Sequence, residues 1–289
     1  MHPAIRRDGV AVITGAAKGI GFAIAQSVAR MGMRLVLLDS DEDALHDASN
    51  RLRQNQVRVS AVVGDVTDQG LIARLQDEAM SLGDVALVVN NAGIIKGAGP
   101  WQDPEKWRRL MEINFWSVLT MQQAFMPQLL SQTTPSAIVN LGSKEGITTP
   151  PGNAAYSVSK AALRVLTEQL AHELRERVGS KVTAHLLIPG YTFTPMNYPG
   201  MTQETSKPEA MWTADQVADS LLARMAINDF YILCEDNEVT RALDEKRIQW
   251  SADDLIQNRP ALSRWHPDFR EQFKEFAHEA VTTIPSKSQ

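Results

Sequence analysis

The stretch "VAVITGAAKGIG", residues 10–21, decides the fold of this chain. It begins with an apolar run of the kind that forms a buried strand, and Gly15, Gly19 and Gly21 come next. The following segment, 19–32, has the apolar spacing of a helix. Glycines placed in this way let the chain turn tightly and approach a pyrophosphate, which the helix N-terminus binds through free N–H groups and a partial positive charge. The stretch therefore predicts a nucleotide-binding turn rather than a bare tight turn.

The rest of the chain alternates apolar strands with helices. We expect strands at 10–15, 34–40, 57–65, 85–90, 136–143, 181–189 and 230–234. We expect helices at 19–32, 41–54, 67–83, 103–130, 153–178 and 213–228. Continuous Val, Ile and Leu strands alternating with helices are typical of a parallel sheet covered on both faces, and right-handed crossovers make it doubly wound. The sequence therefore predicts an α/β fold with a doubly wound, seven-stranded parallel sheet of the Rossmann type.

The pattern divides the chain into a long strand–helix part and a shorter, charged C-terminal part. No repeat, low-complexity run or linker interrupts residues 1–234, so we expect one dinucleotide-binding and catalytic domain there. Residues 235–289 are charged and helical in pattern, and we expect them to pack on the same domain or on a partner subunit. A stripe of phenylalanines with an acidic opposite face favours such packing over membrane contact: Phe269, Phe273 and Phe276.

Composition excludes several classes of partner. The 289 residues carry a net charge of −5, which argues against nucleic acid or an anionic membrane surface. No run approaches the roughly 18 apolar residues of a membrane span, and no apolar segment of a secretory signal follows the N-terminus. The single cysteine, Cys234, fits a reducing compartment, so we expect a cytoplasmic protein. The six histidines have no metal-binding spacing, and we expect no metal.

The choice between NAD and NADP depends on two residues near the glycine turn. Asp39 ends the second predicted strand, eighteen residues after Gly21. A carboxylate there accepts hydrogen bonds from the adenosine ribose and repels a 2′-phosphate, which favours NAD. Lys18 could instead pair with that phosphate. We favour NAD, because a like-charge clash should outweigh one flexible, exposed lysine, and we keep NADP as the alternative.

A second stretch, "AAYSVSKAAL" (154–163), holds a candidate for proton transfer. Tyr156 and Lys160 are four residues apart, so they share one face of the predicted helix. An ammonium beside a phenol favours the phenolate and predicts a lowered pKa for Tyr156. The spacing alone is common by chance, and either residue could be an ordinary surface residue.

Taken together, the motifs resemble those of the short-chain dehydrogenase/reductase family, in its single-domain form. The order and spacing match in "TGAAKGIG" (14–21), "NNAG" (90–93), Asn114, Ser143 and "YSVSK" (156–160). The resemblance extends from about residue 8 to 234. Five agreeing signals favour functional roles over the plainer ones, in which Asn114 caps or bends a helix and Ser143 ends a strand.

The resemblance implies a catalytic set of four residues. Tyr156 would act as general base toward the substrate hydroxyl, with Lys160 and the oxidised nicotinamide favouring its phenolate. Ser143 would hydrogen-bond the substrate oxygen, and Asn114 would hold a water that connects Lys160 to solvent. Run in reverse, Tyr156 donates its proton to a carbonyl.

The resemblance also implies the residues that hold the cofactor. Asp65 and Val66 would lie along the adenine, Asn91 and Ala92 along the adenosine ribose, and Thr192 and Thr194 would close over the nicotinamide side. The full set is Gly15, Lys18, Gly19, Ile20, Gly21, Asp39, Asp65, Val66, Asn91, Ala92, Gly93, Tyr156, Lys160, Pro189, Gly190, Thr192 and Thr194. Of these, Thr192 stands where the family more often has a branched apolar residue, and Asp65 could be a plain strand-end turn residue.

The chain departs from the family after residue 234. Typical members end there with a glycine-rich segment in a tetramer interface, so we expect a homodimer formed by the helices at 103–130 and 153–178, with a tetramer still possible. Segment 191–212 lies where the family has a lid over the substrate. Its apolar side chains predict a partly hydrophobic substrate: Met196, Tyr198, Met201, Met211 and Trp212.

Three functions are compatible with these observations. The one we favour is an NAD-dependent oxidoreductase that transfers hydride between the cofactor and a small-molecule secondary alcohol or ketone. The second is an NADPH-dependent ketone reductase, which Lys18 motivates. The third is a non-catalytic dinucleotide sensor or scaffold, which would commonly have lost Tyr156 or Lys160, and neither is lost here.

Overall fold

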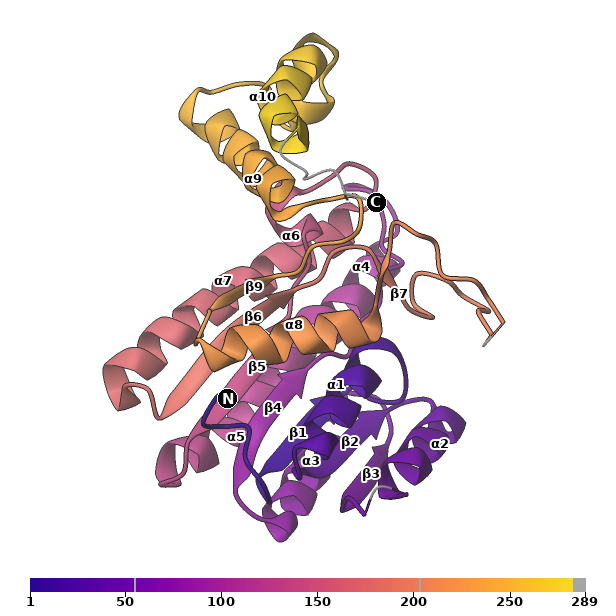
Figure 1. The fold of residues 1–289 in the computed structure, drawn as a ribbon, viewed down its shortest axis with the longest axis vertical. Helices are drawn as coiled ribbons and strands as arrows, with labels where there is room; N and C mark the ends of the chain where they lie inside the picture. The colour runs from indigo at the N-terminus through magenta and orange to yellow at the C-terminus, as the bar shows by residue number, and fades with distance from the viewer. Residues whose placement is uncertain (55, 203, 283–289) are drawn as a thin grey trace, which may run out of the picture.

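A computed structural model describes residues 1–54, 56–202 and 204–282 of the chain. Seven parallel strands form one sheet in the order β3-β2-β1-β4-β5-β6-β9, which confirms the predicted doubly wound fold (Figure 1). The strands are β1 (Val10–Thr14), β2 (Arg34–Asp39), β3 (Val59–Val63), β4 (Val85–Asn90), β5 (Ser136–Leu141), β6 (Val182–Ile188) and β9 (Tyr231–Leu233). The strand order reverses between β1 and β4, where open α/β sheets form a ligand crevice beyond the carboxyl ends of the strands.

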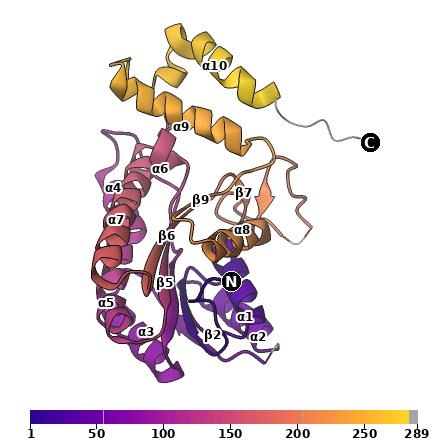
Figure 2. The ribbon, with the colours of Figure 1, turned by 60° about the vertical axis from the view of Figure 1, so that its left-hand side comes forward.

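Helices cover both faces of the sheet (Figure 2). One face carries α1 (Gly19–Arg30), α2 (Glu42–Arg53) and α8 (Ala214–Ala226), and the other carries α3 (Gln69–Leu82), α5 (Ser117–Ser131) and α7 (Ala154–Val178). Because successive strand residues point to opposite faces, β1 supplies Ala11 and Ile13 to one apolar core and Val10 and Val12 to the other. Both faces are therefore buried, as the continuous apolar strands predicted.

The single helix predicted at 103–130 is wrong in detail. The chain there forms α4 (Pro104–Met111), a π-helical turn η1 (Glu112–Trp116) and then α5. Within η1, the amide of Asn114 is bonded to the main chain of Ile94: its Oδ1 accepts from the Ile94 N–H at 2.9 Å, and its Nδ2 donates to the Ile94 carbonyl at 2.9 Å. These bonds tie the widened turn to the loop after β4, and such turns are frequent at functional sites.

Other predicted boundaries differ by one or two residues. The expected strand at 57–65 shortens to β3, and the one at 136–143 ends at Leu141. Three short elements were not predicted: α6 (Glu145–Thr148), β7 (Thr192–Phe193) and β8 (Trp212–Thr213), the last two of which pair with each other.

The C-terminal residues form a helical pair above the sheet (Figures 1 and 2). This pair, α9 (Arg241–Ile256) and α10 (Arg270–Thr282), is joined through two short 3-10 turns, η2 (Ser263–Trp265) and η3 (Pro267–Phe269). Trp250 of α9 is buried against two phenylalanines of the predicted stripe, with ring centroids 5.4 Å from both Phe273 and Phe276. On its other side, α9 contacts α6, close to the carboxyl end of β5.

Across residues 1–54, 56–202 and 204–282, there is no helix with the length and apolar character needed to span a bilayer.

The N-terminus is anchored by two buried histidines that the fold holds neutral. His2 Nδ1 accepts from the Ala4 N–H at 3.2 Å, so its proton is on Nε2, 3.3 Å from Thr183 Oγ1. His185 Nδ1 is 2.8 Å from the Asp229 carbonyl and therefore donates, so His185 Nε2 accepts from Thr183 at 2.9 Å. The bonds thus occupy both acceptor nitrogens. Burial lowers the pKa of His2 to about 4, and burial also lowers that of His185.

Stability should therefore fall in mild acid. Below the ordinary histidine pKa of 6.5 the unfolded chain binds a proton that the folded chain takes up only near pH 4, so the free energy of unfolding decreases as pH falls. Between pH 7.5 and 5, His2 should account for a loss of roughly 2 kcal/mol. His2→Asn, which keeps an acceptor for Ala4 and does not titrate, should shrink this loss by about that amount in urea unfolding. The exposed control His172→Asn should leave it unchanged, and an equal loss in all three proteins would contradict the prediction.

Candidate active site

A cleft of about 620 Å³ opens beyond the carboxyl ends of β1, β4 and β5. Its volume is within the usual range for a small-molecule or cofactor site. Sixteen of the predicted site residues line it: Gly15, Lys18, Gly19, Ile20, Asp39, Asp65, Val66, Asn91, Ala92, Gly93, Ser143, Tyr156, Pro189, Gly190, Thr192 and Thr194. The remaining three, Gly21, Asn114 and Lys160, are not part of its lining. Asn114 and Lys160 are buried, with 0% and 3% of their surface exposed.

The glycine turn leaves no room for side chains. Gly15 has a φ of +62°, a conformation that residues with a Cβ rarely adopt. A Cβ on Gly21 would lie 2.2 Å from the Gly15 carbonyl oxygen and 2.5 Å from Asn91 Nδ2. That amide of Asn91 donates to the carbonyls of Thr14 and Gly15, at 3.0 and 2.9 Å, and so braces the turn against the end of β4. The result is a shallow main-chain cradle at the N-terminus of α1, which suits a pyrophosphate.

The carboxylate of Asp39 is fixed across this turn. Its Oδ2 accepts from the Ala17 N–H at 2.9 Å, and its Oδ1 accepts from the Asp41 N–H at 3.1 Å. Lys18 is ion-paired with Asp41 at 2.6 Å. The lysine that could have paired with a 2′-phosphate therefore already has a carboxylate partner, while the negative charge of Asp39 faces the cleft.

At the same end of the cleft, the carboxylate of Asp65 is ion-paired with Arg109 of α4. It also accepts from the N–H and the hydroxyl of Thr67, at 2.9 and 2.8 Å. Arg109 lines the cleft as well. Asp65 therefore holds α4 against the strand end, a contact that its position in the sequence did not indicate.

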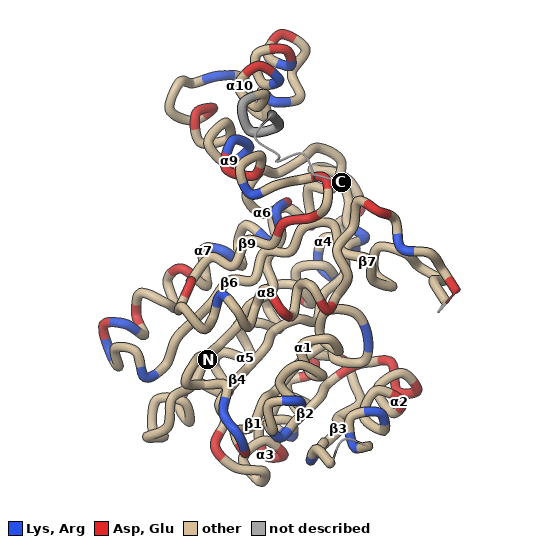
Figure 3. Tube along the Cα trace, viewed as in Figure 1, with Lys and Arg blue, Asp and Glu red and all other residues tan. Residues whose placement is uncertain are grey.

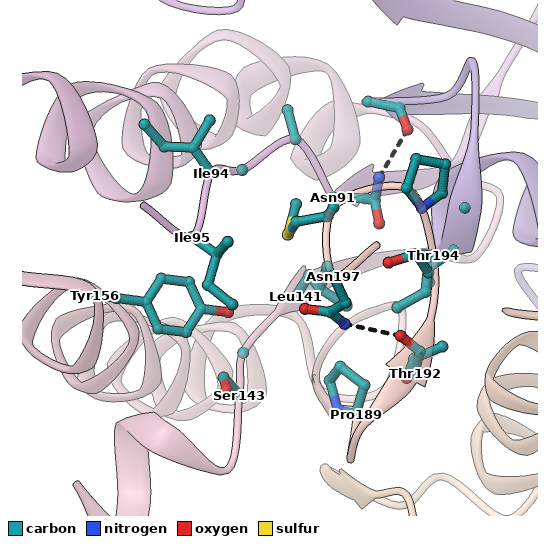
Figure 4. Close-up of a pocket in the computed structure, with 18 of the residues that line it drawn as sticks. Asn91, Ile94, Ile95, Leu141, Ser143, Tyr156, Pro189, Thr192, Thr194 and Asn197 are labelled. Carbon is teal, nitrogen blue, oxygen red and sulfur yellow. Dashed lines mark hydrogen bonds between the residues drawn. The ribbon is translucent and has the colours of Figure 1, made fainter. Parts of the chain in front are cut away.

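The predicted catalytic side chains meet at the opposite end of the cleft. Figure 4 shows the Tyr156 ring entering from α7, with its hydroxyl directed into the cleft near Ser143, which follows β5. Beneath them, Lys160 Nζ lies 5.7 Å from the Tyr156 ring centroid and donates to the Leu141 carbonyl at 2.7 Å. Asn114 Nδ2 is 3.2 Å from the hydroxyl of Ser159 on the same helix. The structure thus brings α7, β5 and η1 together at one point.

The prediction that Lys160 lowers the pKa of Tyr156 is wrong when only the groups of the protein itself act on the phenol. Burial raises the pKa of Tyr156 to about 12, an effect that the nearby Ser143 hydroxyl opposes and the Glu145 carboxylate increases. Burial also lowers the pKa of Lys160 to about 8. The lysine ammonium is directed to a main-chain carbonyl and not to the phenol oxygen, so the i,i+4 spacing does not produce the expected ion pair.

Segment 191–212 lines the cleft, but mostly through residues other than those predicted for its inner face. Of the five apolar side chains predicted for that face, only Met196 lines the cleft. The other lining residues of the segment are Tyr191, Thr192, Thr194, Pro195, Asn197 and Ala210. Met211 is buried inside the segment, and Tyr198 packs on Phe193 with ring centroids 5.2 Å apart. Thr194 faces the glycine turn, because a Cβ on Gly19 would lie 3.3 Å from its methyl group.

The C-terminal extension supplies part of the wall, which the sequence did not reveal. Its cleft-lining residues are Asp236, Glu238, Val239 and Arg247. Lys144, the residue after Ser143, is ion-paired with Asp244 of α9 at 2.5 Å and lies 3.6 Å from Asp236. The only signal available was the charge density of "CEDNEVTRALDEKRIQW" (234–250), which does not indicate where the segment folds.

The fold and the site define a nicotinamide-dependent oxidoreductase that acts on CH–OH groups. A family model described as short chain dehydrogenase matches residues 9–205. The 1-deoxy-11-beta-hydroxypentalenate dehydrogenase of Streptomyces exfoliatus is 32% identical over 259 residues, which cover 88% of this chain and 93% of that protein. The chain belongs to the short-chain dehydrogenase family.

Solved structures agree with this assignment. A short-chain dehydrogenase/reductase from Burkholderia phymatum in complex with NAD matches with a TM-score of 0.78 and 30% identity, covering 89% of this chain and 96% of that one. An alcohol dehydrogenase from Thermococcus sibiricus complexed with 5-hydroxy-NADP matches with a TM-score of 0.67 and 26% identity, covering 78% and 94%. The cofactor is a nicotinamide dinucleotide.

Proposed function

We propose that the protein interconverts a small-molecule secondary alcohol and its ketone, with NAD as the preferred cofactor. The observation that carries the proposal is the meeting of the Tyr156 and Ser143 hydroxyls at one end of a cleft whose other end is the glycine turn. Both groups needed for proton transfer therefore share one cavity with the cradle for the cofactor. The apolar side chains of Ile94, Ile95 and Met196 in the same cleft support a partly hydrophobic substrate.

The residues present fit a dinucleotide. Main-chain groups of the glycine turn would bind the pyrophosphate, Asp39 the adenosine ribose, and Pro189, Gly190 and Thr192 would lie along the nicotinamide. The bound cofactor would supply the nicotinamide ring, which accepts a hydride in its oxidised, positively charged form and donates one in its reduced, uncharged form.

The chain's own residues handle the proton. Ser143 would hold the substrate oxygen by a hydrogen bond, next to the Tyr156 hydroxyl. Tyr156 would take the hydroxyl proton during oxidation and give it back to the carbonyl during reduction. Its pKa of about 12 keeps the phenol protonated at neutral pH, as reduction of a ketone requires, and positive charge in the cleft would be needed to favour its phenolate for oxidation. Lys160, with a pKa lowered to about 8, can lose or gain a proton near neutral pH behind it.

We also propose how the chain is organised and where it works. Residues 1–234 would form the catalytic domain and 235–289 an extension packed on it. A homodimer is supported by apolar side chains left exposed on η1 and α7, with Trp116 48%, Val158 47% and Val165 46% exposed; a tetramer is the alternative. The single, buried Cys234 supports a cytoplasmic location.

Cofactor preference tests the role of Asp39. Wild-type protein should bind NAD about 10- to 100-fold more tightly than NADP, because the fixed carboxylate repels a 2′-phosphate. In Asp39→Ala the affinity for NAD should fall about tenfold and that for NADP should rise, as measured by calorimetric titration with each cofactor. The exposed control on α2, Asp47→Ala, should keep the wild-type ratio. Tighter binding of NADP by the wild type would refute the choice of NAD.

Activity tests the proposed reaction itself. A panel of alcohols, polyols, steroids and aryl ketones, assayed with both cofactors at 340 nm, should reveal turnover of secondary alcohols or their ketones. Tyr156→Phe serves as the blank. Tight cofactor binding without turnover of any member of the panel would count against the proposal.

A further inference from the structure

The extension places a cation in the cleft. Arg247, on the second turn of α9, lines the cavity that holds Tyr156 and Ser143. Its side chain is only 22% exposed. Its helix contacts α6, and Figure 3 shows basic and acidic residues together where the two helices meet. A guanidinium in a partly buried cleft requires either acceptors from the protein or a ligand that supplies them.

The protein offers few hydrogen-bond acceptors to the guanidinium of Arg247. Among the described residues its only ion pair is with Asp244, one turn earlier, at 3.9 Å between Nη1 and Oδ1. That distance is too long for a hydrogen bond. Its Nε is buried and has no hydrogen-bond partner. Donors that are buried without acceptors are costly, and the planar fork of arginine matches the two oxygens of a carboxylate.

The nearby buried carboxylates are already engaged. Asp244, with its side chain 4% exposed, is paired with Lys144 at 2.5 Å. Asp236 accepts from the N–H groups of Tyr191, Glu238 and Val239, at 3.3, 3.1 and 2.7 Å, and Lys144 is 3.6 Å away. Neither carboxylate is therefore free to bind the guanidinium of Arg247 in a bidentate manner.

Two further acids line the cleft without pairing to Arg247. Glu145 lies near Tyr156, whose pKa it helps to raise, and Glu238 is exposed at the rim. No ion pair within 4.0 Å joins either of them to Arg247 in the described chain. Because Lys144 is near both buried aspartates, Arg247 has no carboxylate within hydrogen-bonding distance in the described part of the chain.

A second guanidinium, that of Arg264, interacts electrostatically with Arg247. Arg264 lies over the rings of Trp265 and Phe273, at 4.7 and 4.9 Å from their centroids. Burial lowers its pKa to about 10, the positive charge of Arg247 adds to that shift, and the carboxylate of Asp244 opposes it. Arg264 stays protonated at neutral pH, and its charge adds to the attraction that Arg247 exerts on an anion in the cleft.

We propose that Arg247 binds a carboxylate of the substrate, which makes the substrate class an apolar hydroxy acid or the corresponding keto acid. This inference rests on the proposed alcohol–ketone function. The reacting carbon lies at Tyr156 and Ser143, and the carboxylate lies toward α9, held by charge-assisted hydrogen bonds from the fork of Arg247. The apolar part of the cleft, lined by Ile94, Ile95 and Met196, takes the skeleton between the two ends.

Binding to the complex of the protein with NADH tests the proposal without relying on turnover. The probes are cyclohexanecarboxylate and cyclohexanecarboxamide, titrated calorimetrically. Wild-type protein should bind the carboxylate about 10- to 100-fold more tightly than the amide, and Arg247→Met should abolish that preference. Arg247→Lys should keep part of it, because the charge remains and the fork is lost. The matched control is Arg241→Met, since Arg241 is on the same helix, 47% exposed and paired with Glu245 at 2.7 Å.

Turnover separates this proposal from the proposed function. With 4-hydroxycyclohexanecarboxylate and its methyl ester, wild-type protein should show a KM lower for the acid by about 10- to 100-fold, and Arg247→Met should equalise the two with little change in kcat. Equal binding of carboxylate and amide by wild type, or equal KM for acid and ester, would overturn the carboxylate site while leaving the alcohol–ketone reaction standing. A loss of NADH affinity in Arg247→Met would also overturn it, by making Arg247 a cofactor residue. Absence of turnover alone would count against the proposed function and leave the binding result to decide on Arg247.

Discussion

Tyr156→Phe is expected to lower turnover by about 10²- to 10⁴-fold, the usual contribution of a positioned general acid or base. The hydroxyl is the only part of the side chain that is removed, and it points into the cleft beside Ser143 (Figure 4). Burial and packing of the ring are retained, so the affinity for NAD should change less than threefold and the melting temperature should hardly change. Steady-state kinetics, cofactor titration and thermal unfolding measure the three quantities.

A matched control separates loss of the proton carrier from loss of a phenol in general. Tyr231 donates to Glu168 at 2.8 Å on the protein surface, far along α7 from the cleft. Tyr231→Phe should therefore keep wild-type turnover. If Tyr156→Phe retained more than about a tenth of wild-type turnover, proton transfer would have to use another group, and the mechanism proposed for the site would fail.

Gly21→Ala is expected to abolish cofactor binding in practice, with a loss of affinity of at least about 100-fold. The new Cβ would lie 2.2 Å from the Gly15 carbonyl and 2.5 Å from Asn91 Nδ2, inside van der Waals contact with both. The turn and its brace must move apart, and the cradle for the pyrophosphate moves with them. Overpacking of this kind also destabilises the fold by about 1–3 kcal/mol. Calorimetric titration with NAD and urea unfolding measure the two effects.

The control for this change is another glycine in the first turn of a helix. Gly70, in α3, has ordinary backbone angles, and a Cβ there would approach only the Asp68 carboxylate, at 3.3 Å. Gly70→Ala should keep cofactor affinity and cost little stability, because alanine favours helix over glycine. Equal NAD affinity in Gly21→Ala and wild type would show that the cradle does not bind the pyrophosphate.

The fold was predictable because its signals are local. Each β-strand is an apolar run bounded by turn residues, and strand–helix alternation leaves a doubly wound parallel sheet as the natural arrangement. The π-helical turn at Asn114 was not predictable, since it depends on hydrogen bonds to Ile94, twenty residues earlier in the chain. Apolar periodicity does not register one extra residue in a helical turn.

Part of the candidate site was likewise predictable from the sequence, and part was not. The glycine turn, Ser143 and Tyr156 could be located from spacing, and the structure gathers them in one cleft. The direction in which the pKa of Tyr156 shifts could not be predicted. Burial raises it, and the spacing of residues in the sequence does not show which side chains are buried. Arg247 was missed for another reason: it reaches the cleft through the packing of α9 on α6, a contact between segments about a hundred residues apart.

The bridge from Lys144 to Asp244 has a consequence for how the enzyme can diversify. In the proposed reaction the reacting groups come from residues before 235, whereas Asp236, Glu238, Val239 and Arg247 of the C-terminal extension line one wall of the same cleft. A different C-terminal segment would change this wall of the cleft without moving Tyr156 and Ser143, as long as it still offers Lys144 an acidic partner. We therefore expect the C-terminal extension to influence which substrate binds, because the ion pair between Lys144 and Asp244 attaches it next to Ser143.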